Sequence, residues 1–196
     1  MDVRIRPHAL AGAVTPPPSK SMAHRLLLAA ALADGVSTVK NVALSQDIEA
    51  TLRCMAALGA NWERTDKSTL RVTGIGGKEK SFPELPRFDC GESGSTLRFL
   101  IPIALAVAGG GVFTGRGRLM ERPQKPYFDL FDEKGISYEQ TAGALTVRGT
   151  LTPGEYRLAG KSQVSFSRGC FSRCRCSAAA RRWYRPRGSR AATMSP

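Results

Sequence analysis

The feature that most constrains this chain is an internal repeat. Residues 69–74 (TLRVTG) and residues 144–149 (ALTVRG) share a strand-like pattern that ends in glycine. The same order of helix-like and strand-like segments precedes each string. A repeat unit of this kind rarely buries its apolar face alone, because neighbouring copies share one core. The sequence therefore predicts two tandem copies of one structural unit, with a third copy expected after Thr150.

Hydrophobic periodicity predicts a βαβαββ order in each copy, which gives a mixed α/β (α+β) fold class. In the first copy we expect a strand before the prolines at 16–18, a helix opened by Ser19, a strand over 36–42, a helix capped by Ser45, and strands over 60–64 and 70–73. In the second copy we expect a strand over 87–90, a helix over 93–107, a strand over 112–114, a helix over 125–134, and a hairpin of strands over 136–140 and 145–148 with Gly143 in its turn. Turn glycines and serine caps set the expected boundaries.

The positive charge of the chain is unevenly placed. The formal net charge is +13, yet residues 161–196 hold nine Lys and Arg and no Asp or Glu. Residues 1–160 then carry 20 basic and 16 acidic side chains, a modest cationic excess that suits an anionic substrate. Trp183 and Tyr184 lie among arginines of the tail, so adventitious nucleic-acid binding stays open as an alternative, with no specific nucleic-acid partner expected.

Cysteine spacing and hydropathy narrow the class of protein further. Cys170, Cys174 and Cys176 lack a second pair of ligands, so we expect no metal site. Cys54 and Cys90 are each expected to be buried and reduced. The first residues are charged and do not resemble a signal peptide, and no apolar stretch is uninterrupted. We expect a soluble, cytoplasmic protein without a membrane partner.

Both copies begin a helix with residues that could bind an anion. These are Ser19, Lys20 and Ser21 in the first copy, and residues 92–96 (ESGST) in the second. Exposed N–H groups and the positive helix end attract phosphate or carboxylate there. Serine and glycine at a helix start are more often simple caps, so this pattern alone does not define a site.

Three longer strings make the pattern specific. Residues 17–25 (PPSKSMAHR), 89–98 (DCGESGSTLR) and 114–123 (TGRGRLMERP) resemble, in order, the three N-terminal signatures of EPSP synthases, and the resemblance covers residues 1 to about 160. This family has two domains, each of three βαβαββ units with helices inside and sheets outside, an inside-out α/β barrel. The resemblance implies that residues 1–13 give a strand to the other domain. Residues 14–160 would form two units of an incomplete domain.

The resemblance also implies an activity and a set of binding residues. The family transfers the enolpyruvyl group of phosphoenolpyruvate to shikimate 3-phosphate in aromatic amino acid biosynthesis, without a cofactor and as a monomer. By motif, Lys20 would contact both substrates, Ser21 and Arg25 would bind shikimate 3-phosphate, and Gly94 and Arg122 would bind phosphoenolpyruvate. A lysine between two anions offsets their repulsion, and an arginine fork suits carboxylate or phosphate. The family's acid and base groups lie in its C-terminal half, so no catalytic residue is assigned in this chain.

For three residues in or near the signatures, the sequence predicts an interaction or a structural role. Glu92 and Ser95 stand where many members have Asn and Thr, and we expect Glu92 to pair with Lys20 or Arg122 if it lies near an anion site. Asp47 follows the Ser45 cap and is expected to interact with the helix dipole, with no chemical role. His24 lies inside the signature helix and is expected to be structural.

The tail departs from the family after Gly160. The family continues with a segment resembling Gly-Asn-Val-Ser-Ser-Gln-Phe, whereas this chain has residues 161–166 (KSQVSF). Loss of one base in the Asn codon converts the first string into the second. We therefore expect residues 161–196 to be an out-of-frame tail that does not fold, and the chain to be truncated and inactive alone. The related UDP-N-acetylglucosamine enolpyruvyl transferase is the alternative, disfavoured because residues 18–21 (PSKS) replace its Lys-Asn pair.

Overall fold

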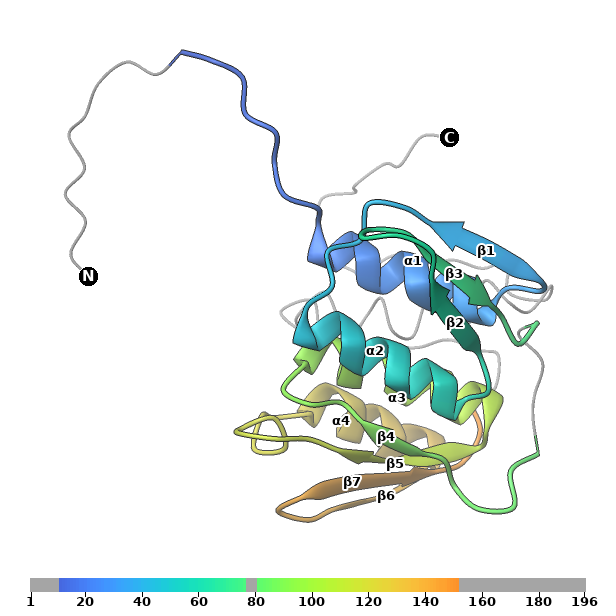
Figure 1. Cartoon of the computed structure of the whole chain (residues 1–196). Helices are drawn as coiled ribbons and strands as arrows, with labels where there is room; N and C mark the ends of the chain where they lie inside the picture. Colours follow the sequence, from blue (N-terminus) through green and yellow to red (C-terminus); the bar gives the residue numbers. More distant parts are fainter. Residues whose placement is uncertain (1–10, 77–80, 152–196) are drawn as a thin grey trace, which may run out of the picture.

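The computed structural model describes residues 11–76 and 81–151. The expectations for residues 1–10 and for the tail over 161–196 lie outside these ranges. Figure 1 shows the described elements in chain order. The first copy holds α1 (Lys20–Leu32), β1 (Val36–Val39), α2 (Gln46–Ala57), β2 (Asn61–Arg64) and β3 (Leu70–Thr73). The second copy holds β4 (Arg87–Asp89), α3 (Gly94–Val107), β5 (Gly110–Thr114), α4 (Lys125–Lys134), β6 (Ser137–Gln140) and β7 (Ala144–Arg148).

The two copies form sheets with the same pairing order. In the first sheet β3 lies between β1 and β2, and both pairings are antiparallel. In the second sheet β7 lies between β5 and β6 in the same antiparallel arrangement, while β4 is added parallel to β5. Val36 pairs with Thr73 in one copy as Gly110 pairs with Arg148 in the other. The structure therefore confirms the predicted repeat and the mixed α/β fold.

The strand expected before the prolines does not form within residues 11–15, the part of that segment that the structure describes. Residues 11–19 are described and contain no strand. Three consecutive prolines at 16–18 have no N–H to donate, so this segment cannot form a regular ladder. The second copy, which has no proline run at this place, forms β4 beside β5 instead.

Serine caps start three of the four helices that the structure describes. The side chain of Ser19 accepts a hydrogen bond from the Met22 amide, and Ser45 does the same for Ile48. Ser93 caps α3 by accepting from Thr96. Each cap satisfies one of the amides that a helix start leaves without a partner, typically worth about 1 kcal/mol. The predicted starts at these serines are confirmed.

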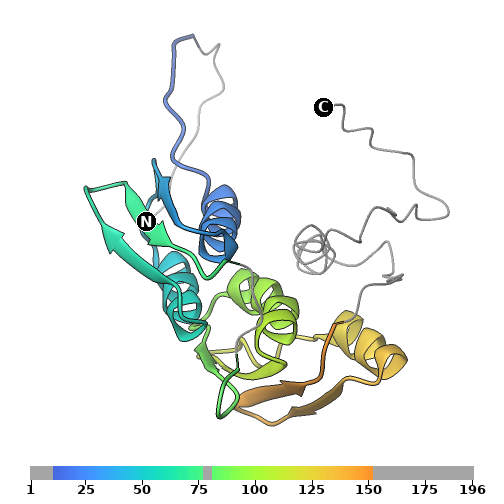
Figure 2. The ribbon, with the colours of Figure 1, turned by 90° about the vertical axis from the view of Figure 1, so that its right-hand side faces the viewer.

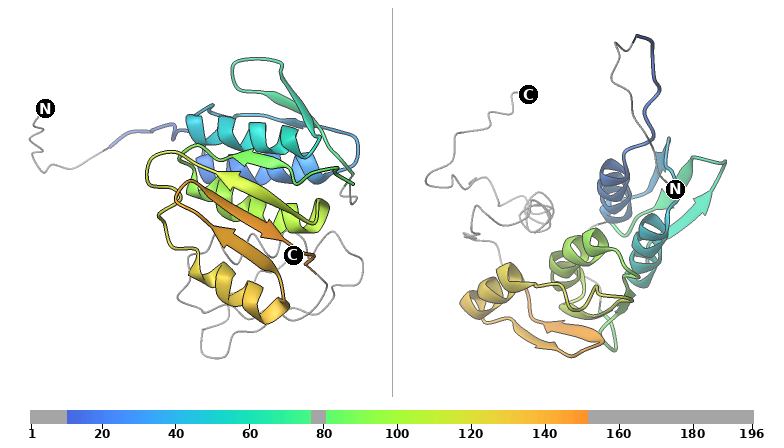
Figure 3. Two further views of the ribbon diagram at one scale, coloured as in Figure 1. Left: turned by 90° about the horizontal axis from the view of Figure 1, so that it is seen from below. Right: turned by 90° about the vertical axis from the view of Figure 1, so that its left-hand side faces the viewer.

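The helices gather on the inner side of a bend, and the two sheets lie on its outer side. Figure 2 shows α1, α3 and α4 along the inner side, and Figure 3 shows the same arrangement from two further directions. Almost every residue of α3 is buried, and α2 contacts α1, α3 and β4. A helix that is apolar all round belongs inside a core, which explains why α3 joins the two copies.

Cys54 on α2 and Cys90 after β4 are both buried free thiols, as expected. The two thiols are not isolated from each other, however. A hydrogen bond with Cys54, followed by burial, raises the pKa of Cys90 well above its usual range. The Cys90 thiol therefore stays protonated, and both cysteines pack as small apolar side chains between the two copies.

Two glycines of the second sheet have different backbone requirements. Gly110 has a φ of 135°, and a Cβ there would lie 2.1 Å from the carbonyl oxygen of Val147. Gly143, in the turn between β6 and β7, would place a Cβ in open space and does not have a left-handed φ. Thr141 closes that turn by accepting from, and donating to, the backbone of Ala144. The hairpin is thus closed by a threonine, and a special conformation of Gly143 is not needed.

We predict that Gly110→Ala lowers the free energy of unfolding by about 1–3 kcal/mol, because the new methyl group meets backbone and the φ is unfavourable. Gly143→Ala, the matched control, should change it by less than about 0.5 kcal/mol. Urea unfolding followed by circular dichroism measures both. Equal effects at the two positions would contradict this assignment of backbone constraint.

Candidate functional site

A buried chain of polar side chains joins the starts of α1, α2 and α3. His24 Nδ1 lies 2.8 Å from Thr51 Oγ1, which lies 2.7 Å from Thr96 Oγ1. Thr96 hydrogen-bonds the Ser93 cap at 2.8 Å. All four side chains are buried, where leaving a polar group unpaired costs about 1–3 kcal/mol. The chain therefore holds three helix starts together, and their positive dipole ends gather at one edge.

Lys20 lies at this edge in an ion pair. Its Nζ is 2.6 Å from Asp47 Oδ2, across the gap between the starts of α1 and α2. The side chains remain 58% and 29% exposed, so the ammonium is held in place and is still open to solvent. Asp47 is thus a partner of a candidate substrate-binding lysine, a role that its position after the Ser45 cap did not reveal.

Arg25 and Ser21 occupy the same face of α1, one turn apart. Arg25 Nη1 donates to Ser21 Oγ at 2.6 Å and to the Ser21 carbonyl oxygen. The Arg25 guanidinium also lies 5.7 Å from the ring centre of Phe99 on α3, which is within cation–π range. Since Ser21 Oγ accepts from Arg25, its own proton remains available for another acceptor. The two predicted residues form one fixed hydrogen-bonding unit.

Gly94 and Arg122 are brought together from different parts of the second copy. Gly94 is the first residue of α3, and Arg122 lies in the loop between β5 and α4. A Cβ at Gly94 would lie 2.9 Å from Arg122 Nη1, closer than real Cβ contacts allow. The absence of a side chain at Gly94 therefore lets the guanidinium approach the start of α3. Arg122 takes part in none of the ion pairs formed by residues 11–76 and 81–151.

The two groups of predicted residues meet through Asp47. Its side chain pairs with Lys20, and its carbonyl oxygen accepts from Thr96 Oγ1 at 3.3 Å. Thr96 follows Gly94 by two residues on α3. The site is therefore two adjacent cationic groups joined by one acidic residue and the buried threonine chain.

The expected pairing of Glu92 with Lys20 or Arg122 is wrong. Lys20 pairs with Asp47, and Glu92 turns toward the loop between β5 and α4. Its Oε1 lies 3.0 Å from where a Cβ of Gly117 would be. Glu92 forms no ion pair with either cation among the described residues.

The turn that leads into α3 is fixed by Asp89. One carboxylate oxygen accepts from the Gly91 amide at 3.0 Å, and the other lies 3.4 Å from Arg53 Nη2 and 3.3 Å from Arg116 Nη2. The Gly91 hydrogen bond is the largest cause that holds the pKa of Asp89 below its usual range, and the two arginines lower it further. This carboxylate positions the turn and does not point to a proton-transfer role.

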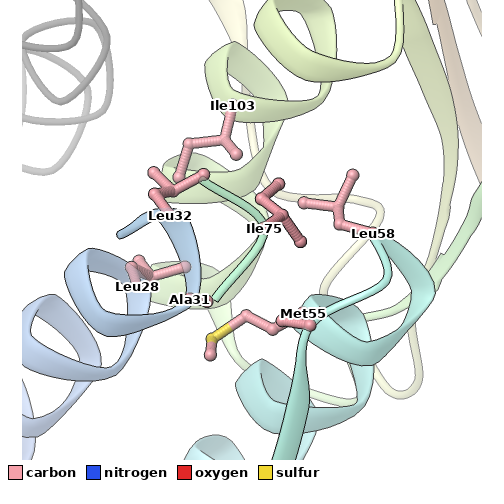
Figure 4. Close-up of a pocket in the computed structure, with 8 residues that line it drawn as sticks. Leu28, Ala31, Leu32, Met55, Leu58, Ile75 and Ile103 are labelled. Carbon is pink, nitrogen blue, oxygen red and sulfur yellow. The ribbon is translucent and has the colours of Figure 1, made fainter. Parts of the chain in front are cut away.

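The pocket that the structure shows, called the apolar hollow below, does not lie at the cationic edge formed by the helix starts. Figure 4 shows apolar side chains converging from the later parts of three helices and the segment after β3. Its lining consists of Leu28, Ala31, Leu32, Met55, Leu58, Ala60, Ile75 and Ile103. It contains no charged or hydroxyl side chain and lies toward the C-terminal ends of α1 and α2, away from the cationic edge. This hollow is part of the apolar inner face and has no group that could do chemistry.

The described part of the chain was also compared with the requirements of a metal site and of a membrane-spanning helix. Within residues 11–76 and 81–151, no three side chains of His, Cys, Asp or Glu gather as a metal ion would require. In the same ranges no helix combines the length and apolar character needed to cross a bilayer.

Comparisons with known proteins agree with this geometry. The family model of EPSP synthase (3-phosphoshikimate 1-carboxyvinyltransferase) matches residues 5–165. A 3-phosphoshikimate 1-carboxyvinyltransferase of Clostridium novyi is 43% identical over 178 residues, which cover 86% of this chain and 40% of the relative. The enzyme of that name from Clostridium beijerinckii is 44% identical over 174 residues, with the same coverage. EPSP synthase from Acinetobacter baumannii has a TM-score of 0.69 at 23% identity, covering 81% of this chain and 37% of that structure.

The repeated α/β units and their clustered cations define an α/β repeat protein with cationic side chains at its helix starts. Together with the match over residues 5–165, this places the chain in a single family. The chain belongs to the EPSP synthase family, whose members are transferases. It spans about 40% of the length of the curated relatives that it matches. The resemblance drawn from the three signatures is thus confirmed.

His24 is the buried ionisable group of this site. Its side chain is 1% exposed, and Nε2 has no hydrogen-bond partner in the described structure. Burial lowers the pKa of His24, the nearby charges of Lys20 and Arg25 lower it further, and Asp47 opposes them. Because the folded chain resists a proton that the unfolded chain accepts, stability should fall as the pH drops below the ordinary histidine pKa of about 6.5.

We predict that His24→Asn reduces this pH dependence. Asparagine can still hydrogen-bond Thr51 but does not titrate, so the free energy of unfolding should vary less between about pH 7.5 and pH 5 than in the wild type. Urea unfolding at a series of pH values measures the slope in both proteins. An unchanged slope in the variant would show that His24 is not the group responsible.

Proposed function

We propose that this chain is part of a 3-phosphoshikimate 1-carboxyvinyltransferase, which transfers the enolpyruvyl group of phosphoenolpyruvate to shikimate 3-phosphate. In this reaction a C–O bond forms between the shikimate hydroxyl and the enolpyruvyl carbon, and inorganic phosphate leaves. The family membership and the names of the relatives support this activity. The chain supplies cationic substrate contacts, while acid and base groups are expected in the part of the enzyme that it does not contain.

The observation that carries the proposal is the contact between Arg122 and Gly94. The Arg122 guanidinium, which forms no ion pair within residues 11–76 and 81–151, combines a full positive charge with the positive end of α3. Such an arrangement favours an anion such as phosphoenolpyruvate. Fixed donors of this kind can stabilise negative charge without reorganising during the reaction.

Shikimate 3-phosphate is assigned to the neighbouring group on α1. Arg25 and Ser21 form a rigid donor pair, with the Ser21 hydroxyl free to donate to a substrate oxygen. On this proposal Lys20 contacts both substrates and lowers their mutual repulsion. In the absence of substrate, Asp47 holds the Lys20 ammonium, so a bound anion competes with this carboxylate for the same charge.

We further propose that residues 14–160 form two of three units of one domain, and that residues 161–196 are read out of frame. The end of the family match at residue 165 supports this boundary. On this proposal the chain of 196 residues binds substrates weakly and does not turn them over. The activity then depends on restoring the remaining part of the enzyme.

The test is to restore one base after the Gly160 codon and to express the resulting protein. We expect release of inorganic phosphate that requires both phosphoenolpyruvate and shikimate 3-phosphate, and no release by the chain of 196 residues under the same conditions. A phosphate assay with each substrate omitted in turn provides the control. A folded, frame-restored protein without activity on these substrates would refute the proposal.

In the frame-restored enzyme, we predict that Gly94→Ala raises the KM for phosphoenolpyruvate by roughly tenfold, because the methyl group displaces the Arg122 guanidinium. The KM for shikimate 3-phosphate should change much less, since Ser21 and Arg25 are untouched. Gly143→Ala, which adds a methyl group in open space, should leave both constants unchanged. Equal increases in the two KM values would contradict the assignment of Gly94 to one substrate.

A further inference from the structure

The two copies of the repeat differ at one edge of their sheets. In the second copy, β5 pairs with β7 on one side and with β4 on the other. In the first copy β1 holds the place of β5, because Val39 pairs with Leu70 as Phe113 pairs with Leu145. Within the part of the chain that the structure describes, β1 pairs with β3 alone. The edge of β1 that corresponds to the β4 side of β5 is therefore open.

The residues that correspond to β4 lie just before α1. Ser19 and Ser93 cap equivalent helices. Counting back from each cap places Val14 where the second copy has Phe88. Phe88 is fully buried and stacks on Phe113, with 4.9 Å between the ring centres. Val14 is 89% exposed, and Figure 1 shows the segment before α1 leaving the body of the molecule. The first copy thus has an open strand edge and, away from it, an exposed segment of strand-forming length.

The proline run prevents this segment from folding back onto its own sheet. In the second copy the chain turns from β4 into α3 through Gly91, which has a φ of 57°. Pro17 holds the same place in the first copy, and the proline ring fixes φ near −65°, so that turn cannot form. Residues before a proline are restricted to extended conformations, and consecutive prolines form a stiff spacer. Residues 11–15 are therefore extended and directed away from β1 of the same chain.

The open edge of β1 suits an uncharged, extended segment. Neither β1 (VSTV) nor residues 11–15 (AGAVT) contain a charged side chain or a proline, the usual protections of an edge strand. In the second copy the Val112 amide donates to the carbonyl oxygen of Pro86 at 2.9 Å. Thr38 holds the place of Val112, so its amide faces the open edge. A parallel strand added there would pair this amide with a carbonyl oxygen.

We propose that two copies of this chain exchange these segments, so that residues 11–15 of each form a parallel strand on β1 of the other. Val14 of one copy would lie in register with Val39 of its partner, as Phe88 lies in register with Phe113 within one chain. Exchange of an identical segment through a stiff hinge is a low-cost route to a dimer, and the prolines at 16–18 provide that hinge. The proposal concerns the assembly of the chain of 196 residues and does not rest on the proposed function.

The test is analytical ultracentrifugation of the full chain over a series of concentrations, where we expect a monomer–dimer equilibrium. Val14→Asp should raise the dimer Kd by roughly a hundredfold, about tenfold for each of the two exchanged strands, because it places a carboxylate against an apolar surface. Ala13→Asp, the matched control, makes the same change of charge one residue earlier, where the side chain faces the opposite side of the strand. Its equivalent, Arg87, is exposed, so the control should change the Kd by less than about twofold.

Hydrogen exchange followed by NMR checks where the copies pair. The Thr38 amide should exchange more slowly at concentrations that favour the dimer than at those that favour the monomer. The Val72 amide lies on β3, which is paired on both sides, and its exchange should not depend on concentration. In Val14→Asp the concentration dependence at Thr38 should disappear. Urea unfolding checks that both variants keep the fold, which is expected because Val14 and Ala13 are exposed in the single chain.

Each other outcome overturns the proposal in a distinct way. A chain that stays monomeric over the whole concentration series shows that the segments are not exchanged. A dimer that is equally stable in Val14→Asp forms through another surface, such as the apolar hollow. Slow exchange of the Thr38 amide in the monomer shows that residues 11–15 return to β1 of the same chain. None of these results bears on the proposed activity, which is tested separately by phosphate release from the frame-restored enzyme.

Discussion

The buried hydrogen bonds between His24, Thr51, Thr96 and Ser93 are the constraint on which the site depends. They cross from α1 to α2 and from α2 to α3, and so they connect helices from both copies of the repeat. Apolar contacts are non-directional, so they specify the relative positions of these helices less sharply than hydrogen bonds do. Directional bonds in a buried place fix these positions, because a shift of one helix leaves polar groups unpaired. The relative positions of the cations at the helix starts follow from this chain.

Most of the fold follows from the sequence, and the finer contacts of the site do not. Periodicity and serine caps predicted the order of helices and strands, since both are local properties of the chain. The strand before the prolines was wrong because the missing N–H groups outweighed the symmetry of the repeat. The contact of Arg122 with Gly94 agrees with the signature resemblance. The Lys20–Asp47 pair and the orientation of Glu92 depend on which helix starts are neighbours, and local sequence does not specify that.

The cations of the site differ in how far their positive charges are neutralised, and this difference separates their roles. Lys20 has a carboxylate partner, so its charge is partly neutralised until an anion displaces Asp47. Arg25 is held by a hydroxyl, a carbonyl oxygen and an aromatic ring, which fix its direction without cancelling its charge. Arg122 has no carboxylate among the described ion pairs and lies over a helix start, where an anion gains most. The attraction for negative charge is therefore greatest at the start of α3.

The N-terminal and C-terminal ends of the helices carry different kinds of side chain and have different functions. At their N-terminal ends, α1, α2 and α3 expose capped amides, cations and hydroxyls, and at the other end leucines, a methionine and an isoleucine surround an apolar hollow (Figure 4). A helix dipole makes only the N-terminal end attractive to anions, which is why the proposed substrate site is assigned to that end. Apolar side chains at the opposite end then hold the same helices together without competing hydrogen bonds. Because each helix takes part in both, the packing at one end sets the spacing of charges at the other.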